Sequence, residues 1–245
     1  KILTLRSRAF FYLAFGVDDR SQRFLLTPFA SMIREEDGIQ VEIPVGNSRL
    51  AGNLFLPEGA DRCVIFAHGS GSSRFSPRNR RIAKLLFQSG IGSFLTDLLT
   101  ASEDAVPELR FDIPLLTDRL VEITRSVNAI HAMDSVRLSY FGASTGAAAA
   151  LLAAGRLPEL VRAVVCRGGR TDLAGELVSR VRAATLLIVG EMDQPLIPIN
   201  NQTYRLLRCK KEIVFIPGAT HLFEEPGKLD EVGRLTAQWV LTNGG

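Results

Sequence analysis

From Ile39 to the end of the chain, short β-rich segments alternate with helical segments, and this alternation limits the fold more than any other feature. Strands joined by links long enough for a crossover helix form a mostly parallel sheet with helices on both faces. The pattern predicts an α/β fold with eight strands, at Ile39–Val45, Leu50–Leu56, Cys63–Ala67, Gly92–Leu95, Val136–Phe141, Val161–Cys166, Thr185–Val189 and Glu212–Ile216. The first two flank the tight turn Gly46-Asn47-Ser48 and should form an antiparallel hairpin. Helices are expected at Asn79–Gln88, Leu115–Met133, Thr145–Ala154, Ala174–Val181, Asn200–Leu207 and Leu229–Leu241.

The first 38 residues do not share this alternation, so we divide the chain into an N-terminal extension, 1–38, and one α/β domain, 39–245. The extension carries several arginines and six aromatic residues, Phe10, Phe11, Tyr12, Phe15, Phe24 and Phe29. It could pack on the sheet edge, on a second subunit of a homodimer or on a membrane surface. Aromatic stripes at helical spacing are usually core, which favours packing. Because the chain starts at Lys1 and not at a methionine, a targeting segment could be missing.

Composition narrows the class of partner. Lys and Arg number 29 against 26 for Asp and Glu, which is not the basic footprint of a nucleic-acid binder. No apolar run approaches the roughly 18 residues that cross a bilayer. The three cysteines, Cys63, Cys166 and Cys209, are odd in number and far apart, as in reduced cytoplasmic proteins. We therefore expect a cytoplasmic protein that acts on a small molecule.

One motif supplies a nucleophile. Gly142-Ala143-Ser144-Thr145-Gly146 has the pattern G-x-S-x-G and lies between a predicted strand and an alanine-rich helix. A sharp turn there lifts the hydroxyl of Ser144 out of the sheet and directs the amide of Thr145 and the helix dipole at a developing oxyanion. The alternative is that Ser144 only caps the helix.

A serine hydroxyl needs a base, and the base needs an orienting acid. Of the three histidines, only His221 follows Ser144, just after the last predicted strand. The aspartates between the two are Asp172 and Asp193. Asp193 is favoured because it follows a buried strand, Thr185–Val189, at the end where open α/β sheets bind ligands, whereas nearby arginines give Asp172 a structural explanation.

The loop after the third strand, Ala67-His68-Gly69-Ser70-Gly71-Ser72-Ser73, should supply a second oxyanion donor. We predict the backbone N–H of Ser70 for this role, beside that of Thr145. His68 is expected to orient the loop, with substrate binding as its alternative.

Together with Gly190-Glu191-Met192-Asp193 and Gly218-Ala219-Thr220-His221, these motifs resemble the α/β-hydrolase superfamily, and most of all the dienelactone-hydrolase-like proteins. The similarity runs from about Ile39 to the C-terminus. It implies hydrolysis of an ester or lactone through a covalent intermediate, without a metal or cofactor. Dienelactone hydrolases carry cysteine where this chain has Ser144, which puts dienelactone itself in doubt. The short link between Arg170 and Thr185 predicts that no large lid is present.

Several arginines raise the question of whether the substrate is an anion. Arg74, Arg78, Arg80 and Arg81 crowd the start of a predicted helix, where positive charge opposes the helix dipole. Arg74 and Arg167 could bind an anionic substrate, or the arginines could form a surface paired with Asp97, Glu103 or Asp104, and we favour the paired surface. A peptidase, an acyltransferase or a non-catalytic binding protein with the same fold remain as alternatives.

Overall fold

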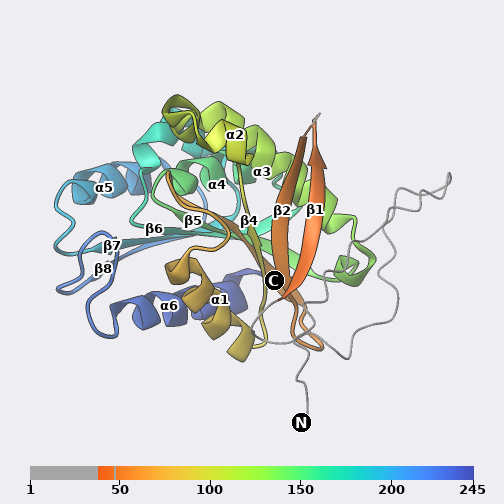
Figure 1. Cartoon of the computed structure of the whole chain (residues 1–245). Helices are drawn as coiled ribbons and strands as arrows, with labels where there is room; N and C mark the ends of the chain where they lie inside the picture. Colours follow the sequence, from red (N-terminus) through yellow and green to blue (C-terminus); the bar gives the residue numbers. More distant parts are fainter. Residues whose placement is uncertain (1–37, 47) are drawn as a thin grey trace, which may run out of the picture.

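The computed structural model describes residues 38–46 and 48–245, and these form one eight-stranded sheet in the order β1-β2-β4-β3-β5-β6-β7-β8 (Figure 1). The strands are β1 (Ile39–Val45), β2 (Ser48–Phe55), β3 (Arg62–Ala67), β4 (Gly92–Thr96), β5 (Arg137–Ala143), β6 (Val161–Arg167), β7 (Ala184–Gly190) and β8 (Lys211–Ile216). β2 is antiparallel to both β1 and β4, and every other pair is parallel. The eight predicted strands and the hairpin are confirmed.

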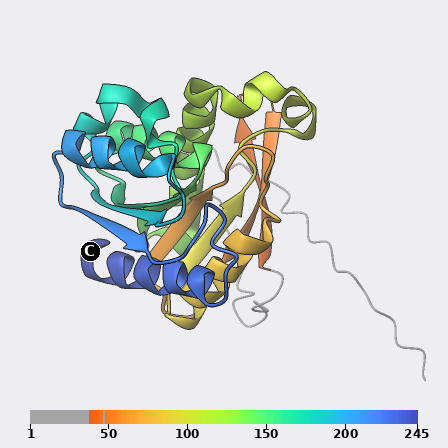
Figure 2. The ribbon, with the colours of Figure 1, turned by 90° about the vertical axis from the view of Figure 1, so that its left-hand side faces the viewer.

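Helices cover both faces of the sheet (Figures 1 and 2). α1 (Pro77–Gln88) and α6 (Lys228–Asn243) pack side by side on one face. The other face carries α3 (Ile113–Asn128), α4 (Thr145–Arg156) and α5 (Leu196–Leu206). Between β4 and α3 lie the short helix α2 (Ala101–Asp104) and the 3-10 turn η2 (Pro107–Phe111). Two further 3-10 segments, η3 (His131–Met133) and η4 (Thr171–Arg180), follow α3 and β6.

The central strands are apolar because both of their faces are covered. All seven residues of β7 are buried, and β5 and β6 each expose at most their first two residues to any degree. Alanine makes up half of α4, and its residues Ala147–Ala150 have no exposed surface, so this helix packs closely on the sheet. The carboxyl ends of β3, β5, β6, β7 and β8 consequently form a rigid edge from which the site loops project.

The structure departs from the predicted helices in two places. The segment predicted as a helix at Ala174–Val181 is the 3-10 segment η4, which is kinked at Gly175 (φ 58°). The helix predicted to reach Met133 ends at Asn128, and a separate turn, η3, follows it. The whole link from β6 to β7 contains only η4, so no large lid is inserted there.

Three further expectations concern the cysteines, membrane-spanning segments and the N-terminal extension. All three cysteines are free, and Cys63 and Cys166 are fully buried, as a small apolar residue would be. Across residues 38–46 and 48–245, no helix is both long and apolar enough to span a bilayer. The predicted N-terminal extension lies outside the described residues except for Gly38.

Candidate active site

Ser144 stands on a strained turn between β5 and α4. Its φ of 50° and ψ of −121° put it outside the regions that most residues adopt, and such strain persists only where the surrounding structure enforces it. Its N–H donates to the carbonyl of Arg167 (3.2 Å), and its carbonyl accepts from the N–H of Arg170 (3.0 Å). The turn is therefore anchored to the segment after β6. Ser144 also makes no side-chain cap of α4, which argues against the capping alternative.

Gly146 shows why the motif needs a glycine after the serine. A Cβ atom at this position would lie 2.2 Å from the carbonyl oxygen of Ala67 and 2.5 Å from that of His68. Those contacts are with backbone, which cannot move aside. The glycine therefore lets α4 start directly against the loop after β3.

His221 and Asp193 are brought together from two different loops. Nδ1 of His221 lies 2.7 Å from Oδ2 of Asp193. The Asp193 side chain is 8% exposed and that of His221 is 40% exposed, so a buried carboxylate orients a reachable imidazole. With Nδ1 donating to the carboxylate, Nε2 is the ring nitrogen left for the serine.

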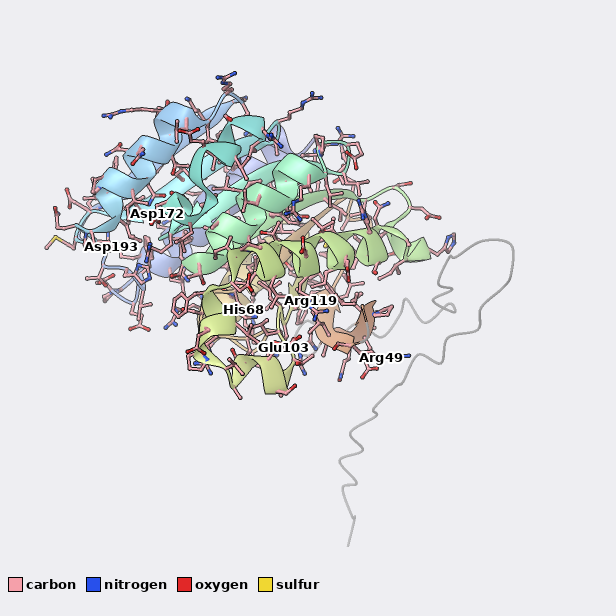
Figure 3. All side chains as sticks on the ribbon, turned by 90° about the horizontal axis from the view of Figure 1, so that it is seen from above. Arg49, His68, Glu103, Arg119, Asp172 and Asp193 are labelled. Carbon is pink, nitrogen blue, oxygen red and sulfur yellow. The ribbon has the colours of Figure 1, made fainter. Side chains whose placement is uncertain are left out.

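Asp172 has a different partner. Its carboxylate is held by the guanidinium of Arg170, with Nε and Nη2 at 2.9 and 2.8 Å from its two oxygens. The Arg170 bond is the main reason that the pKa of Asp172 is lowered. The structure thus places Asp172 in an ion pair and Asp193 against the histidine, on the segments after β6 and β7 (Figure 3).

The segment after β6 lies between the serine and the histidine. Gly168 has a φ of 51°, and a Cβ atom on it would be 3.2 Å from Nδ1 of His221. The neighbouring Arg167 accepts the Ser144 N–H through its carbonyl, as described above, and its guanidinium Nη1 donates to the carbonyl of His221 (3.4 Å). Both sides of the site are therefore built against residues 167–170.

The predicted oxyanion donors lie on adjoining segments. Thr145 is the first residue of α4, where a backbone N–H has no partner within the helix. The N–H of Ser70 donates to the Thr145 hydroxyl at 2.8 Å. In this structure the Ser70 amide is therefore engaged by a side chain, and its role as an oxyanion donor stays a prediction.

His68 is 7% exposed, and the loop uses both of its ring nitrogens. Nδ1–H donates to the carbonyl of Gly69 (3.0 Å), and Nε2 accepts the N–H of Leu98 (3.1 Å). This geometry fits the expected orienting role and leaves neither nitrogen for a substrate. Burial lowers the pKa of His68 below its usual value, so the neutral ring is favoured.

The arginines at the start of α1 are paired. Arg74 forms an ion pair with Asp97, as the paired-surface interpretation expects. Arg78 and Arg81 pair with Glu224 (2.7 Å) and Asp230 (2.8 Å) on the far side of the His221 loop. These acids come from segments more than a hundred residues away in sequence, so the sequence offered no local signal for them.

Two residues of the site escaped the sequence analysis. Gly168, against the imidazole, had a weak signal in the pair Gly168-Gly169 directly after a predicted strand. Phe223, two residues after His221 on the same loop, is fully buried and has a φ of 59°, the left-handed region that bulky residues avoid. Nothing in the sequence marks Phe223, because its burial depends on Arg167 and other distant neighbours.

Comparisons with known proteins agree on the fold. No protein-family model matches the chain. A crystal structure of dienelactone hydrolase from Anabaena variabilis is 48% identical with a TM-score of 0.82, over 84% of this chain and 97% of that one. A lidless α/β serine hydrolase from Xanthomonas campestris is 20% identical with a TM-score of 0.68, over 84% and 95% of the two chains, and shows likeness of fold alone.

Two curated relatives carry another name. Both are Mycobacterium tuberculosis proteins, from strains CDC 1551 and H37Rv, provisionally named phosphoribosyl transferases. Each is 45% identical over 209 residues, which is 85% of this chain and 46% of the relative. The chain therefore spans about half the length of the curated relatives it matches.

The Anabaena enzyme is matched over nearly its whole length at almost half identity, and the eight-stranded, mostly parallel sheet agrees with the fold it represents. This chain belongs to the dienelactone hydrolase family of the α/β hydrolases.

Proposed function

We propose that this chain is a serine hydrolase that cleaves an ester or lactone of a small molecule through a covalent acyl-enzyme. The observation that carries the proposal is the Asp193–His221 pair, assembled at the same sheet edge as a serine on a strained turn. The segment 167–170 contacts both Ser144 and the His221 ring, which supports a single catalytic unit. The chemistry needs neither a metal nor an organic cofactor.

In the proposed reaction, the oxygen of Ser144 attacks the substrate carbonyl while Nε2 of His221 takes the hydroxyl proton. The carbonyl oxygen becomes an oxyanion, for which the N–H of Thr145 and, once freed from the Thr145 hydroxyl, that of Ser70 are the proposed donors. The imidazolium then protonates the leaving alcohol, and the ester bond breaks. Water attacks the acyl-enzyme in the same way and releases the acid, while Asp193 stabilises the imidazolium in both steps.

Labelling by a fluorophosphonate probe tests the proposal. The parent protein should be labelled and should hydrolyse p-nitrophenyl esters. Ser144→Ala should lose both properties with little change in melting temperature, and His221→Ala should lose almost as much, because the residues act as a unit. Ser135→Ala, at an exposed position, serves as the control and should match the parent. Parental turnover in Ser144→Ala would rule out this nucleophile.

The same residues could serve a peptidase or an acyltransferase, and the fold could serve a binding protein without activity. A panel of esters, lactones and peptides, with and without an added acyl acceptor, separates the enzymatic alternatives. Absence of labelling together with retained ligand binding would favour the binding protein. The paired state of Arg74 and Arg78 supports a substrate that does not depend on these two charges.

The name of the M. tuberculosis relatives raises phosphoribosyl transfer as a second candidate. The match covers 85% of this chain, so most of it falls on the α/β-hydrolase fold, while more than half of each relative is unmatched. We infer that the transferase name refers to the unmatched part. Incubation with phosphoribosyl diphosphate and nucleobases should then release no pyrophosphate from this chain, while ester hydrolysis proceeds.

We also propose a cytoplasmic location, because three free thiols, two of them buried, suit a reducing compartment. A homodimer formed through the N-terminal extension stays a prediction that sedimentation or light scattering would test.

A further inference from the structure

Arg167 is a buried cation without an acidic hydrogen-bond partner of its own in the part of the chain that the structure describes. It ends β6, is 6% exposed, and its Nε is buried without a hydrogen-bond partner among the described residues. Glu224 is close enough to influence it, but the Glu224 carboxylate is bonded to Arg78. Burial, with the charge of Arg78, lowers the pKa of Arg167 to about 10, so it is still charged at neutral pH. Keeping such a charge out of water is costly, which calls for a compensating role.

Two contacts of the guanidinium lie on the loop that carries the histidine. Nη1 donates to the carbonyl oxygen of His221 at 3.4 Å. The guanidinium carbon lies 5.7 Å from the centre of the Phe223 ring, within reach of a cation–π interaction. Phe223 is fully buried in a left-handed conformation, which a phenylalanine keeps only when its neighbours hold it there. Arg167 is one of those neighbours.

The backbone of the same residue holds the nucleophile. The carbonyl of Arg167 accepts the N–H of Ser144 at 3.2 Å, and the next residue, Gly168, lies against the His221 ring. One residue therefore contacts the serine turn through its main chain and the histidine loop through its side chain. A shift of the guanidinium is therefore expected to move the His221 loop relative to the serine turn, whose N–H bonds the end of β6.

We propose that Arg167 is a positioning residue, whose guanidinium holds the His221 loop in the place where the imidazole can reach Ser144. The proposal rests on the serine hydrolase function proposed above. It replaces the expectation that Arg167 binds an anionic substrate, because the side chain is almost fully buried and faces the back of the histidine loop. The residue acts through His221 and does not itself touch the reacting atoms.

The test compares Arg167→Met, which keeps length without charge or donors, with Arg167→Lys, which keeps the charge. Arg162→Met is the matched control, since that arginine lies on the same strand, β6, with an exposed side chain and outside the segment that contacts Ser144 and His221. The measurements are the rate of fluorophosphonate labelling, kcat and KM for a neutral and for a carboxylate-bearing p-nitrophenyl ester, and melting temperature.

A positioning role predicts that Arg167→Met loses about tenfold to a hundredfold in labelling rate and in kcat, because a small misplacement of the base has that effect. KM should stay near the parent value, and the loss should be equal for the neutral and the charged ester. Arg167→Lys should recover part of the rate, and Arg162→Met should keep nearly all of it.

Three results would overturn the proposal. A loss confined to the charged ester and expressed in KM would make Arg167 a substrate-binding residue. A lower melting temperature with parental kcat would make its role purely structural. If Arg167→Met does not fold, Phe223→Leu replaces it. Parental rates in that variant would count against a His221 loop that Arg167 holds in place through Phe223. Failure of the hydrolase function itself is separate, because the parent protein would then show no labelling at all.

Discussion

Asp193 and Asp172 follow neighbouring parallel strands but have different partners, and this difference favours Asp193 as the proposed catalytic acid. Asp193 is 8% exposed and bonds His221, while Asp172 is a third exposed and bonds Arg170. Asp193→Asn should keep the geometry but lower kcat by orders of magnitude, up to about ten-thousandfold in the serine-protease precedent, because the imidazolium loses its counter-charge. Steady-state kinetics with a p-nitrophenyl ester measures this loss.

Asp172→Asn is the matched control for that substitution. It removes an ion pair near the surface, worth at most about 1 kcal/mol, and should lower the melting temperature slightly with little kinetic effect. A large kinetic loss in Asp172→Asn, with near-parental rates in Asp193→Asn, would move the acid to the segment after β6.

Gly168 offers a second prediction at the scale of one residue. Alanine there would combine a strained φ of 51° with a Cβ atom 3.2 Å from Nδ1 of His221. Gly168→Ala should cost about 1–3 kcal/mol of stability from the backbone, and it should also lower kcat by displacing the imidazole. Gly59→Ala, with a φ of 73° and open space around it, shares the strain without the contact. If both variants keep the parental kcat, the imidazole does not depend on this close approach.

At the scale of elements, one arginine joins three of them at the edge of the sheet. Arg119 of α3 donates to the carbonyl of Val45 at the end of β1 (2.8 Å) and pairs with Glu103 of α2 (2.8 Å), as Figure 3 lets the reader follow. Glu103 also accepts the Thr100 N–H in a capping box. Burial tends to raise the pKa of Glu103, but the bonds from Thr100 and the charge of Arg119 outweigh it, and the pKa is lowered.

Arg119→Met should therefore destabilise the protein by about 1–3 kcal/mol, because it leaves a carboxylate and a carbonyl without their shared donor. Urea unfolding measures the change. Arg156→Met, which breaks an exposed pair with Asp118 on a neighbouring helix, should cost less than about 1 kcal/mol. Equal losses in the two variants would mean that the Arg119 link adds nothing beyond an ordinary surface pair.

The same elements show which local signals the sequence carried. The strands could be predicted because apolar runs such as Thr185–Val189 are needed wherever helices cover both faces. α2 went unpredicted because it is four residues long and depends on its Thr100 cap. η4 looked helical because its apolar residues face the core at suitable spacing, but Gly175 adopts a positive φ that breaks a regular helix.

At the scale of the whole molecule, the candidate site has two kinds of feature: residues that the sequence predicts, and contacts between segments that are distant in sequence. The sequence predicts Ser144, Asp193 and His221 as the reacting groups because each follows a strand, and the carboxyl ends of parallel strands share one edge. The sequence does not predict the contact of Arg167 with Phe223 or that of Arg78 with Glu224. These contacts join segments that are distant in sequence and that only the packing of α1 and the histidine loop brings together. The assignment of the reacting groups thus rests on position along the chain and stays a prediction, while tertiary packing determines which residues surround them.

His68 gives the fold as a whole a sensitivity to acid. Its imidazole is neutral, and Nε2 accepts the Leu98 N–H. A second ring proton would have to bind Nε2, where it would point at this N–H. Burial lowers its pKa below 6.5, and this outweighs the opposite effect of the Gly69 carbonyl and of Asp97 and Asp104. Below pH 6.5 the unfolded chain therefore binds a proton that the folded protein does not bind. The stability that His68 contributes is complete above that pH and is lost as the pH falls from 6.5 toward the lower folded pKa.

The melting temperature of the parent protein should accordingly fall between pH 7.5 and pH 5, and His68→Gln should flatten this dependence while lowering stability at pH 7.5. The glutamine cannot titrate, and losing the ring weakens the loop after β3. His131→Gln is the control, because the side chain of that histidine is 61% exposed and its replacement should leave the slope unchanged. A His68→Gln variant as acid-sensitive as the parent would show that the response comes from other groups, and that the neutral imidazole under the oxyanion loop does not limit the stability of the fold in acid.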